Sequence, residues 1–474
     1  MWYRRNKTFG CGRYGFWGIL LLIAAAGIGL VAAESKVIDL KTSRGLRIRF
    51  IQEKEMLFVH SQLVVFYENM STYLSQPGIP YLTIFNMFSS DIRESPSALL
   101  GSLRKLGNDY RVENSPDYTK IVVNFLPDRI SQFGGFLNEL FTYDSFRLKA
   151  FAESKENYWG YLQNRKEWKK EVASQIAYSQ FFSSHQLGLT LITPELLKTI
   201  NLAQLRSFCQ NNFRPENAML ILKGNINPNS TMGLLEREMQ FNLKPVKVEE
   251  KKEMLVVNNS RRVFLLNSKD SDLPMVFFFD IAPPSDNIDF IPFFIVNYTL
   301  FHYPIGRLYQ SDRTQLLHVR NYQLNNEIVV HKGISVLCSY SWVNHGDIEN
   351  LVTLVDQEKK RLNLHSVEKN EFVNALNYFR GKLMVNTEDY ENDVEIEINK
   401  AITASNERYL PKPASDAIQN VSLEKINDVA GNYFLINQKA GIREKGIIVI
   451  VGNATQILGD LKSLKPEIID LFGE

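Results

Sequence analysis

The sequence carries one pattern twice, and this repetition restricts the folds that the chain can adopt. In each copy, apolar residues at helical spacing precede an apolar strand that ends in Gly-Asn. The strands are AMLILKGN over 218–225 and GIIVIVGN over 446–453. The copies lie about 220 residues apart, whereas solenoid units repeat roughly every 20–50 residues. We therefore predict a duplicated domain, and function in such a chain tends to sit between the halves.

Length and composition leave room for two well-packed domains. The chain has 474 residues, of which 45% are hydrophobic and 22% are charged, as in globular proteins. The formal net charge is +2, but removing residues 1–33 leaves 50 basic and 52 acidic residues, or −2. Such a nearly neutral body gives no electrostatic reason to expect nucleic-acid binding.

The first 33 residues are expected to be a signal peptide or an N-terminal membrane anchor. Basic residues up to Arg13 precede an uncharged apolar run over 16–33, which ends in VAA and suits a signal peptidase. The run is about 18 residues long, so an uncleaved anchor stays open. A mitochondrial presequence would be amphipathic, and this run is apolar on all sides. We expect an exported protein, periplasmic or held at the membrane by this segment alone.

Hydrophobic periodicity and charge predict the domain organisation. The charge-dense segment 243–260 is expected to link a first domain over 34–242 to a second over 261–474. Strands are predicted over 46–51, 57–67, 110–114 and 118–125, and again near 263–266, 275–281, 322–330 and 334–340. Helices are predicted near 95–107, 130–140, 146–182, 347–362, 368–384, 389–405 and 423–433, with Pro127-Asp128 capping the second of them. This order predicts an α+β fold in which each domain is a mostly antiparallel sheet covered by helices on one face.

The order of elements resembles that of the insulinase-like zinc peptidases, in particular the two-domain chains of the processing-peptidase type. The resemblance covers nearly all of residues 36–474. Its closest part is 185–225, which contains HQLG, FRPEN and MLILKGN, and the segment GRLY over 306–309 also has a family counterpart. The resemblance implies two homologous α+β domains.

The resemblance also identifies the residues that this chain lacks. Catalysis in the family uses H-x-x-E-H on a helix, where two histidines bind zinc and the glutamate activates water. In the matching stretch, Tyr81 replaces the first histidine, Ile84 the glutamate and Phe85 the second histidine, while Gly78 and Phe88 keep their places. The resemblance therefore implies a catalytically degenerate member with no metal, no cofactor and no catalytic residue.

The remaining polar candidates do not restore the site. The third zinc ligand would fall near 160–162, which holds no carboxylate, and Glu153 and Glu156 upstream are interpreted as a solvated helix face. Glu327 and His331 would share a strand face and are interpreted as an exposed polar pair. The run MVFFF over 275–279 is interpreted as a core strand that is buried on both faces.

Family members also hold the substrate backbone with an Arg and a Tyr that lie seven residues apart in the second half. Leu317 and Leu324 stand at these positions. Arg320 and Tyr322 are nearby, but strand alternation is expected to point them to the other face. This departure weakens the simplest scheme, in which an inert subunit lends its Arg/Tyr pair to an active partner.

The two cysteines outside the N-terminal segment show no sign of chemistry. Cys209 falls on the first repeat helix and Cys338 on a strand of the second half. We interpret them as buried free thiols, and a disulfide between the halves stays open.

The sequence thus favours a non-catalytic homologue that acts as the inert partner subunit of an active zinc peptidase. It would form a chamber wall and a surface where extended peptides add to a sheet edge. The alternative is a stand-alone scaffold or binding protein of an envelope complex, as a homodimer or with unrelated partners. An enzyme with a relocated site is disfavoured, because apolar replacements stabilise a core and promote no reaction. A collapsed cleft that leaves only a stable fold stays open.

Overall fold

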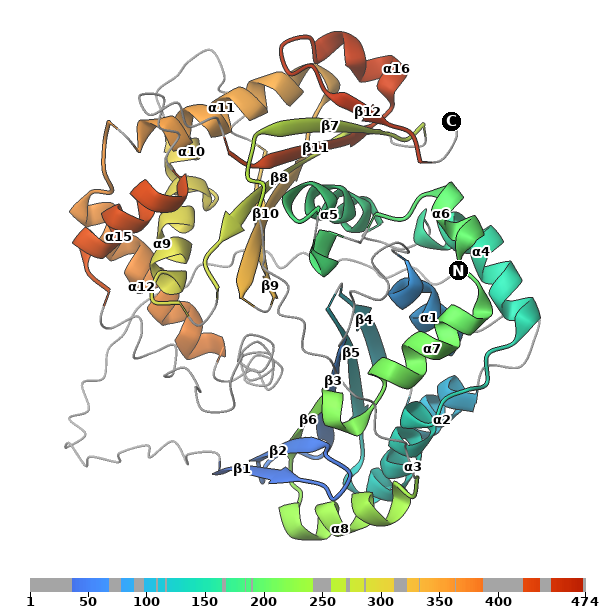
Figure 1. Ribbon diagram of the computed structural model, residues 1–474. Coiled ribbons are helices and arrows are strands. Elements are labelled where there is room, and N and C mark those ends of the chain that lie inside the picture. The colour runs from blue at the N-terminus through green and yellow to red at the C-terminus, as the bar shows by residue number, and fades with distance from the viewer. Residues whose placement is uncertain are drawn as a thin grey trace, which may run out of the picture. The chain divides into compact units, whose positions relative to one another are not determined.

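Two six-stranded sheets, one in each half of the chain, organise the computed structural model (Figure 1). Its contacts separate residues 1–35 from 36–474, and everything described here belongs to the second unit. The structure describes residues 36–67, 78–88, 98–107, 110–115, 117–163, 168–183, 185–188, 191–241, 257–269, 273–284, 287–310, 322–331, 333–362, 364–386, 421–434 and 445–471. Among these residues, no helix has the length and apolar character needed to cross a membrane, and the predicted segment 1–33 lies outside them.

The first sheet has the strand order β1-β2-β6-β3-β5-β4. All neighbouring strands are antiparallel except β2 and β6, which are parallel with Phe50 opposite Leu222. The strands are β1 (Lys36–Lys41), β2 (Arg47–Gln52), β3 (Val59–Phe66), β4 (Tyr110–Asn114), β5 (Tyr118–Phe125) and β6 (Ala218–Gly224). The predicted strands of the first half are therefore confirmed, because alternating apolar residues place one face of each against the core.

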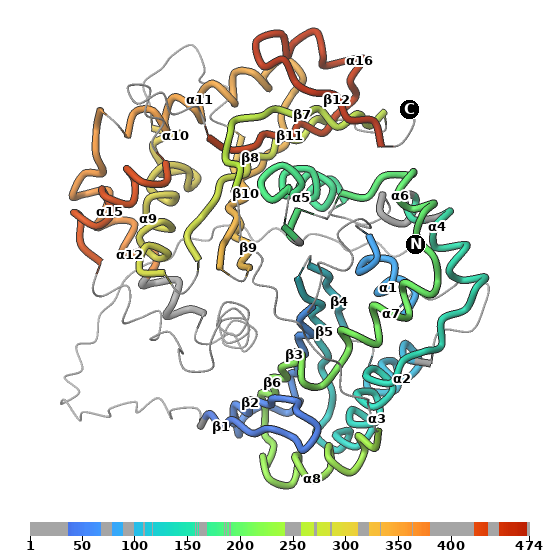
Figure 2. The backbone as a smooth tube through the Cα atoms, in the orientation of Figure 1, coloured from blue at the N-terminus to red at the C-terminus, as the bar shows by residue number. Residues whose placement is uncertain are grey.

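The second sheet repeats this arrangement, with the order β12-β7-β11-β8-β10-β9 (Figure 2). Its strands are β7 (Arg262–Asn267), β8 (Met275–Ala282), β9 (Asn325–His331), β10 (Ile334–Trp342), β11 (Ile447–Gly452) and β12 (Glu467–Ile469). Here β7 and β11 are parallel, as β2 and β6 are, and both β6 and β11 end in Gly-Asn. The edge strand differs, because β12 is parallel to β7 whereas β1 is antiparallel to β2. The duplication predicted from the sequence is confirmed by this matching topology.

Helices pack on one face of the first sheet. The helices of the first half are α1 (Ile79–Phe88), α2 (Ala98–Leu106), α3 (Ile130–Phe141), α4 (Leu148–Gln163), α5 (Trp168–Phe181), α6 (Pro194–Thr199), α7 (Leu202–Asn212) and α8 (Pro228–Glu238), of which α5 lies elsewhere, as described below. The repeat helix α7 begins at a capping box, in which the backbone N–H of Gln204 donates to Asn201 Oδ1 at 3.1 Å and the Gln204 side chain accepts from Asn201 N at 2.7 Å. Its apolar stripe, Leu205 and Phe208, is fully buried in the core of the first half.

The second half has its own helical layer and its own core. The helices are α9 (Phe290–Phe301), α10 (Arg307–Gln310), α11 (Ile348–Arg361), α12 (Lys369–Asn386), α15 (Leu423–Val429) and α16 (Ala454–Ile457). Ser422 caps the second repeat helix, α15, by accepting from Lys425 N at 3.1 Å. Ile426 and Val429 of this helix are fully buried with Val276 and Phe278 of β8. The predicted α+β class, with two homologous sheet-and-helix domains, is confirmed.

Helix α5 belongs to the first half in sequence but covers the opposite face of the second sheet. It packs against β8 and β11, and Ile176 lies in one buried cluster with Phe277 and Phe279. The backbone N–H of Asn258 also donates to the carbonyl oxygen of Phe181 at 2.8 Å. The strand 275–279 is therefore buried on both faces, as its uniformly apolar sequence predicts.

Two local predictions need correction, and two others lie wholly or mostly outside the described residues. The strand expected from Tyr322 begins only at Asn325, because Tyr322 and the next two residues belong to an irregular segment. Asp128 does not cap α3; it lies in a 3-10 turn over Pro127–Arg129, and no side chain caps either element. The helix predicted at 389–405, and the linker apart from 257–260, lie outside the described residues, so the domain boundaries stay predictions.

Candidate functional site

Helix α1 carries the residues that the sequence places at the family's zinc motif, and a glycine fixes where it begins. Gly78 has φ +102°, and its carbonyl oxygen accepts from Leu82 N at 2.8 Å. A Cβ at Gly78 would stand 3.0 Å from Ile192, so both its backbone and its surroundings favour glycine. The retained Gly78 therefore has a structural role that does not depend on catalysis.

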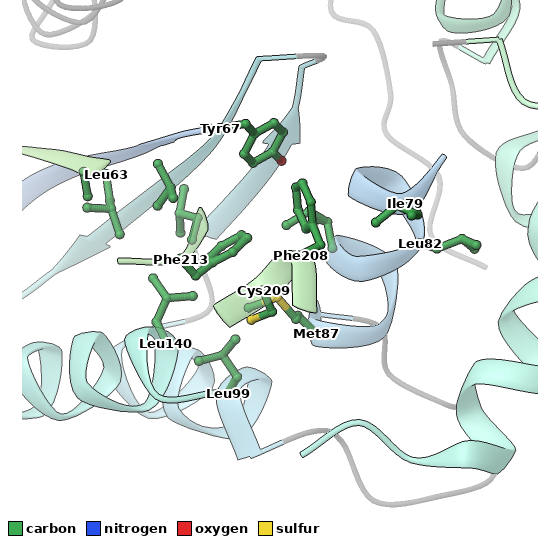
Figure 3. Close-up of a cluster of buried hydrophobic side chains, with 14 of the residues drawn as sticks. Leu63, Tyr67, Ile79, Leu82, Met87, Leu99, Leu140, Phe208, Cys209 and Phe213 are labelled. Carbon is green, nitrogen blue, oxygen red and sulfur yellow. The ribbon is translucent and has the colours of Figure 1, made fainter. Parts of the chain in front are cut away.

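The inward face of α1 is part of a hydrocarbon core (Figure 3). Ile79, Leu82 and Met87 are fully buried, and α1 packs against α7, which contributes Phe208 and Cys209. On the same helix, Ile84 is buried, whereas Tyr81 and Phe85 are half-buried. The helix is thus held by apolar packing along most of its length.

Helix α1 also contacts α4, the helix on which a third ligand would have to lie. Asn86 Nδ2 donates to Ser154 Oγ at 3.0 Å and to the carbonyl oxygen of Leu82 at 2.8 Å. Glu153 lies 3.9 Å from Lys149 in an i,i+4 ion pair, and Glu156 is exposed, in keeping with the predicted solvated face. Residues 161–162 are helical, but their side chains lie outside the description.

These donors do not fit a zinc ion. Zinc is held by imidazole, thiolate or carboxylate groups, and α1 offers one phenol and two hydrocarbons at Tyr81, Ile84 and Phe85. Within the described part of the chain, no three His, Cys, Asp or Glu side chains are grouped so that they could hold a metal ion. We therefore derive no metal-dependent step from this structure.

A buried polar cluster lies beside α1 at the end of the first sheet. The Tyr67 hydroxyl donates to Asn114 and is hydrogen-bonded to Thr119. Burial raises the pKa of Tyr67 well above its usual value, and the nearby Tyr81 and Asp117 raise it further, although Thr119 acts in the opposite direction. Tyr67 is therefore a neutral phenol that satisfies its neighbours, and the sequence did not single it out.

The prediction that Glu327 and His331 form an exposed polar pair is wrong. His331 is completely buried, with Nδ1 3.1 Å from Asp117 Oδ1 and Nε2 3.0 Å from the Tyr178 hydroxyl. Glu327, near the other end of β9, is exposed and accepts from Lys170 at 3.0 Å. The alternation of side chains along the strand correctly predicts that Glu327 and His331 share one face. It could not show that the first half of the chain covers only the end of the strand that carries His331.

The segment GRLY over 306–309, which has a family counterpart, forms hydrogen bonds and an ion pair within the second half. Arg307 donates two hydrogen bonds to Glu371, at 2.6 and 2.7 Å, and also reaches the carbonyl oxygens of His365 and Ser366, each at 2.8 Å. Burial alone would raise the pKa of Glu371, but the hydrogen bonds from Arg307 and from Glu368 N lower it below its usual value. This carboxylate stays ionised and holds α10 against α12.

The positions expected for the family's Arg/Tyr pair are only partly described. Leu317 and Arg320 lie outside the described residues, whereas Leu324 is buried. Tyr322 donates its hydroxyl to Asp347 at 2.7 Å and accepts from Asn344 N at 3.1 Å. The strand-alternation argument fails for Tyr322, which precedes the strand, but its hydroxyl is still occupied within the fold.

Cys209 and Cys338 are free and buried, as the sequence analysis favoured. Burial raises the pKa of both thiols well above the usual value, with a further upward contribution from Asp144 at Cys209 and from Glu327 at Cys338. A disulfide between the halves is therefore excluded in this structure.

The chain has two sheet-and-helix halves, and its described residues hold no group of side chains that could bind a metal ion. Comparison with known families agrees with this description. Residues 199–379 match the family described as the Peptidase M16 inactive domain, which supports the resemblance to the insulinase-like peptidases. No curated protein matches the chain by sequence.

Solved structures extend the likeness over most of the chain. A protease from Helicobacter pylori is similar, with a TM-score of 0.70 at 11% identity, covering 88% of this chain and 99% of that one. A Peptidase M16 inactive domain from Pseudomonas fluorescens has a TM-score of 0.66 at 16% identity, covering 88% and 98%. A chain of complex III2 from Candida albicans has a TM-score of 0.68 at 11% identity, covering 92% and 100%. At such low identity these likenesses establish the fold and leave activity open.

Proposed function

We propose that this protein is a non-catalytic subunit that assembles with an active zinc peptidase of the same family. In this proposal Tyr81, Ile84 and Phe85 occupy the positions of the two zinc-binding histidines and the catalytic glutamate. The observation that carries the proposal is the helix α1 itself, which keeps its glycine start and its contact with α4 while Ile84 is buried as hydrocarbon. A scaffold kept intact around an emptied site points to a role in assembly.

Two further observations support a role in an assembly. The matched family model is the one described as inactive, which agrees with a chain that does no chemistry. One of the similar solved chains comes from complex III2, a multisubunit assembly. A duplicated sheet-and-helix chain of this kind would form one wall of a chamber, and an extended peptide would add to an outer strand such as β4 or β9 by main-chain hydrogen bonds.

A second candidate is a stand-alone scaffold of an envelope complex, as a homodimer or with unrelated partners. Two observations favour it. Leu324 is buried and the Tyr322 hydroxyl is occupied by Asp347, so neither residue serves as a substrate-holding tyrosine in this structure. Both candidates include export, with residues 1–33 acting as a signal peptide or membrane anchor and the body lying in the periplasm or at the membrane.

Native co-purification separates the two candidates. The full chain carries a C-terminal tag and is recovered from membrane and periplasmic extracts without cross-linking, beside an untagged control, and partners are identified by mass. A stoichiometric homologue with intact H-x-x-E-H supports the inert-subunit proposal. If the chain is recovered alone, as a homodimer or with unrelated envelope proteins, the inert-subunit proposal is overturned in favour of the scaffold.

A functional readout then tests what the subunit contributes. If a peptidase partner is recovered, its cleavage of an unstructured peptide is compared with and without this chain. The proposal expects turnover to fall when the chain is removed, and unchanged turnover would contradict a role in forming the chamber. The chain alone is expected to cleave nothing with added zinc.

A further inference from the structure

A chain of three buried side chains joins the two halves where β9 meets the first sheet. Asp117 lies between β4 and β5, His331 ends β9, and Tyr178 is on α5. The distances are 3.1 Å from His331 Nδ1 to Asp117 Oδ1 and 3.0 Å from His331 Nε2 to the Tyr178 hydroxyl. All three side chains are less than a tenth exposed, and the rings of His331 and Tyr178 meet edge to face with centroids 5.3 Å apart.

The hydrogen-bonding capacity of these groups fixes the direction of the chain. An ionised carboxylate only accepts, so His331 Nδ1 must carry a hydrogen and donate to Asp117. When the imidazole is neutral, Nε2 is an acceptor and the Tyr178 hydroxyl donates to it. Asp117 Oδ1 also accepts from Ser115 Oγ at 2.9 Å, and this hydrogen bond fixes the carboxylate within the connection between β4 and β5. The three residues thus make a continuous donor–acceptor chain across the junction.

We propose that Asp117, His331 and Tyr178 form a conformational lock that holds the β9–β10 hairpin of the second half on the first half. Beyond the lock, Val330 of β9 packs in a small apolar cluster with residues of the first sheet such as Val64 and Ile221. The other polar tie is the exposed pair of Lys170 and Glu327, which solvent weakens. A buried chain that includes a carboxylate is stronger, because an unpaired group at its centre would keep its full desolvation cost. The proposal is independent of the proposed function.

Several titratable groups around the lock are neutral at pH 7, so the charge on the lock itself dominates its immediate surroundings. The titratable side chains that interact electrostatically with Asp117 or Tyr178, besides each other, are His331 on β9, Tyr67 after β3, Tyr81 on α1, Tyr118 on β5 and Cys338 on β10. Burial raises the pKa of Tyr67, Tyr178 and Cys338, so these three groups stay neutral at pH 7. Tyr81 belongs to this set, which connects the lock to the face of α1 where the zinc motif would lie.

The pH at which the lock fails follows from Asp117. Burial alone would raise the pKa of Asp117, but the charge and hydrogen bond of His331, together with Ser115, lower it below its usual value. A lowered folded pKa means that the stabilisation is fully present above the unfolded value of about 3.9 and is lost as pH falls through the folded value. The lock is therefore expected to hold at neutral and mildly acidic pH and to open only in stronger acid.

Amide hydrogen exchange of the full chain at pH 7 tests the lock. In Asp117→Asn, exchange of peptides covering 325–340 is expected to rise about tenfold relative to peptides of β2 and β6, because a hydrogen bond to a charged group is weakened. Tyr178→Phe removes one hydroxyl without changing the packing, and a smaller rise in the same peptides is expected. The matched control is Glu327→Gln, which alters the exposed tie on the same strand and should leave exchange of 325–340 unchanged within about twofold.

Each outcome decides the proposal. A rise confined to the β9–β10 hairpin and its contacts in both lock variants supports it. An equal rise in β2 and β6 means that the substitutions only lower global stability, and an unchanged hairpin means that the chain of hydrogen bonds holds nothing; either result overturns the proposal. If Asp117→Asn does not fold, Tyr178→Phe against Glu327→Gln decides by the same criteria.

Discussion

Asn86 of α1 donates a hydrogen bond of 3.0 Å to the hydroxyl of Ser154 on α4, and both side chains are almost fully buried. Helices α1 and α4 are thus joined by a neutral polar contact. A buried amide that loses its partner keeps its desolvation cost, so this one bond influences how the helices pack.

A double-mutant cycle measures this contact. Asn86→Ala and Ser154→Ala are each expected to lower the free energy of unfolding by about 1–2 kcal/mol, with a coupling of about 1 kcal/mol. Urea unfolding followed by circular dichroism gives the four values. Ser179→Ala is the control partner, because Ser179 bonds within its own helix to the Ile176 carbonyl and should be additive with Asn86→Ala. Additivity of Asn86→Ala with Ser154→Ala would contradict the structural role.

The parts of this structure that follow local periodicity could be predicted from the sequence. The strands β4 and β5 begin and end as predicted, and the repeat helix α7 followed by β6 was recognisable from its pattern. The polar network was not predictable, because His331 lies 214 residues from Asp117 and 153 from Tyr178. Such contacts depend on which end of a strand the other half covers, and periodicity carries no information on that.

Some features of the candidate site could likewise be predicted from the sequence, and others required the structure. The residue types at positions 81, 84 and 85 can be read from the sequence, and Tyr, Ile and Phe are not zinc-binding groups. The contact of α1 with α4 and the burial of Tyr67 needed the structure. The expected behaviour of Tyr322 failed for a physical reason, since the irregular segment before β9 does not alternate as a strand does.

A glutamate at position 84 of α1 should be costly. Ile84→Glu places a carboxylate where the side chain is buried, so the free energy of unfolding at pH 8 is expected to fall by about 3 kcal/mol or more. The introduced carboxyl would have a raised pKa, so the loss should be smaller at pH 5 and grow as pH rises. Ile84→Leu, the volume-matched control, should cost less than about 1.5 kcal/mol at either pH.

Thermal and urea unfolding at the two pH values provide the measurement. If Ile84→Glu is no more destabilising than Ile84→Leu, water reaches this position, and the view of α1 as a core helix is wrong. A penalty that does not change between pH 5 and pH 8 would also contradict a buried carboxyl.

The ion pair of Arg307 and Glu371 should show a defined pH dependence. Its lowered pKa means that Glu371 stabilises the fold above its unfolded value of about 4.3, and that this contribution is lost as pH falls through the folded value. The difference in unfolding free energy between the wild type and Glu371→Gln should therefore be constant near neutral pH and shrink towards zero in acid. Arg307→Lys should cost about 1–2 kcal/mol at pH 7, because the two-pronged contact is lost.

Urea titrations from pH 7 to pH 3 give these values. Glu238→Gln is the matched control, since its partner Arg237 is mostly exposed and the change should stay within about 0.5 kcal/mol. A Glu371→Gln difference that grows in acid would reverse the sign of the argument and contradict the ionised pair.

The glycines that end the two repeat strands should differ in their tolerance of alanine. Gly224 has φ +152°, and an added Cβ would lie 2.7 Å from the Phe58 carbonyl oxygen, so Gly224→Ala is expected to cost about 2–3 kcal/mol. At Gly452 the nearest atom is the end of the Ile457 side chain at 2.8 Å, which can move, so Gly452→Ala should cost less than about 1.5 kcal/mol. Gly233→Ala in α8 meets nothing within 4 Å and should stabilise by about 0.5–1 kcal/mol. Unfolding midpoints of the three variants test this order, and equal costs at Gly224 and Gly452 would show that the two copies end their strands in the same way.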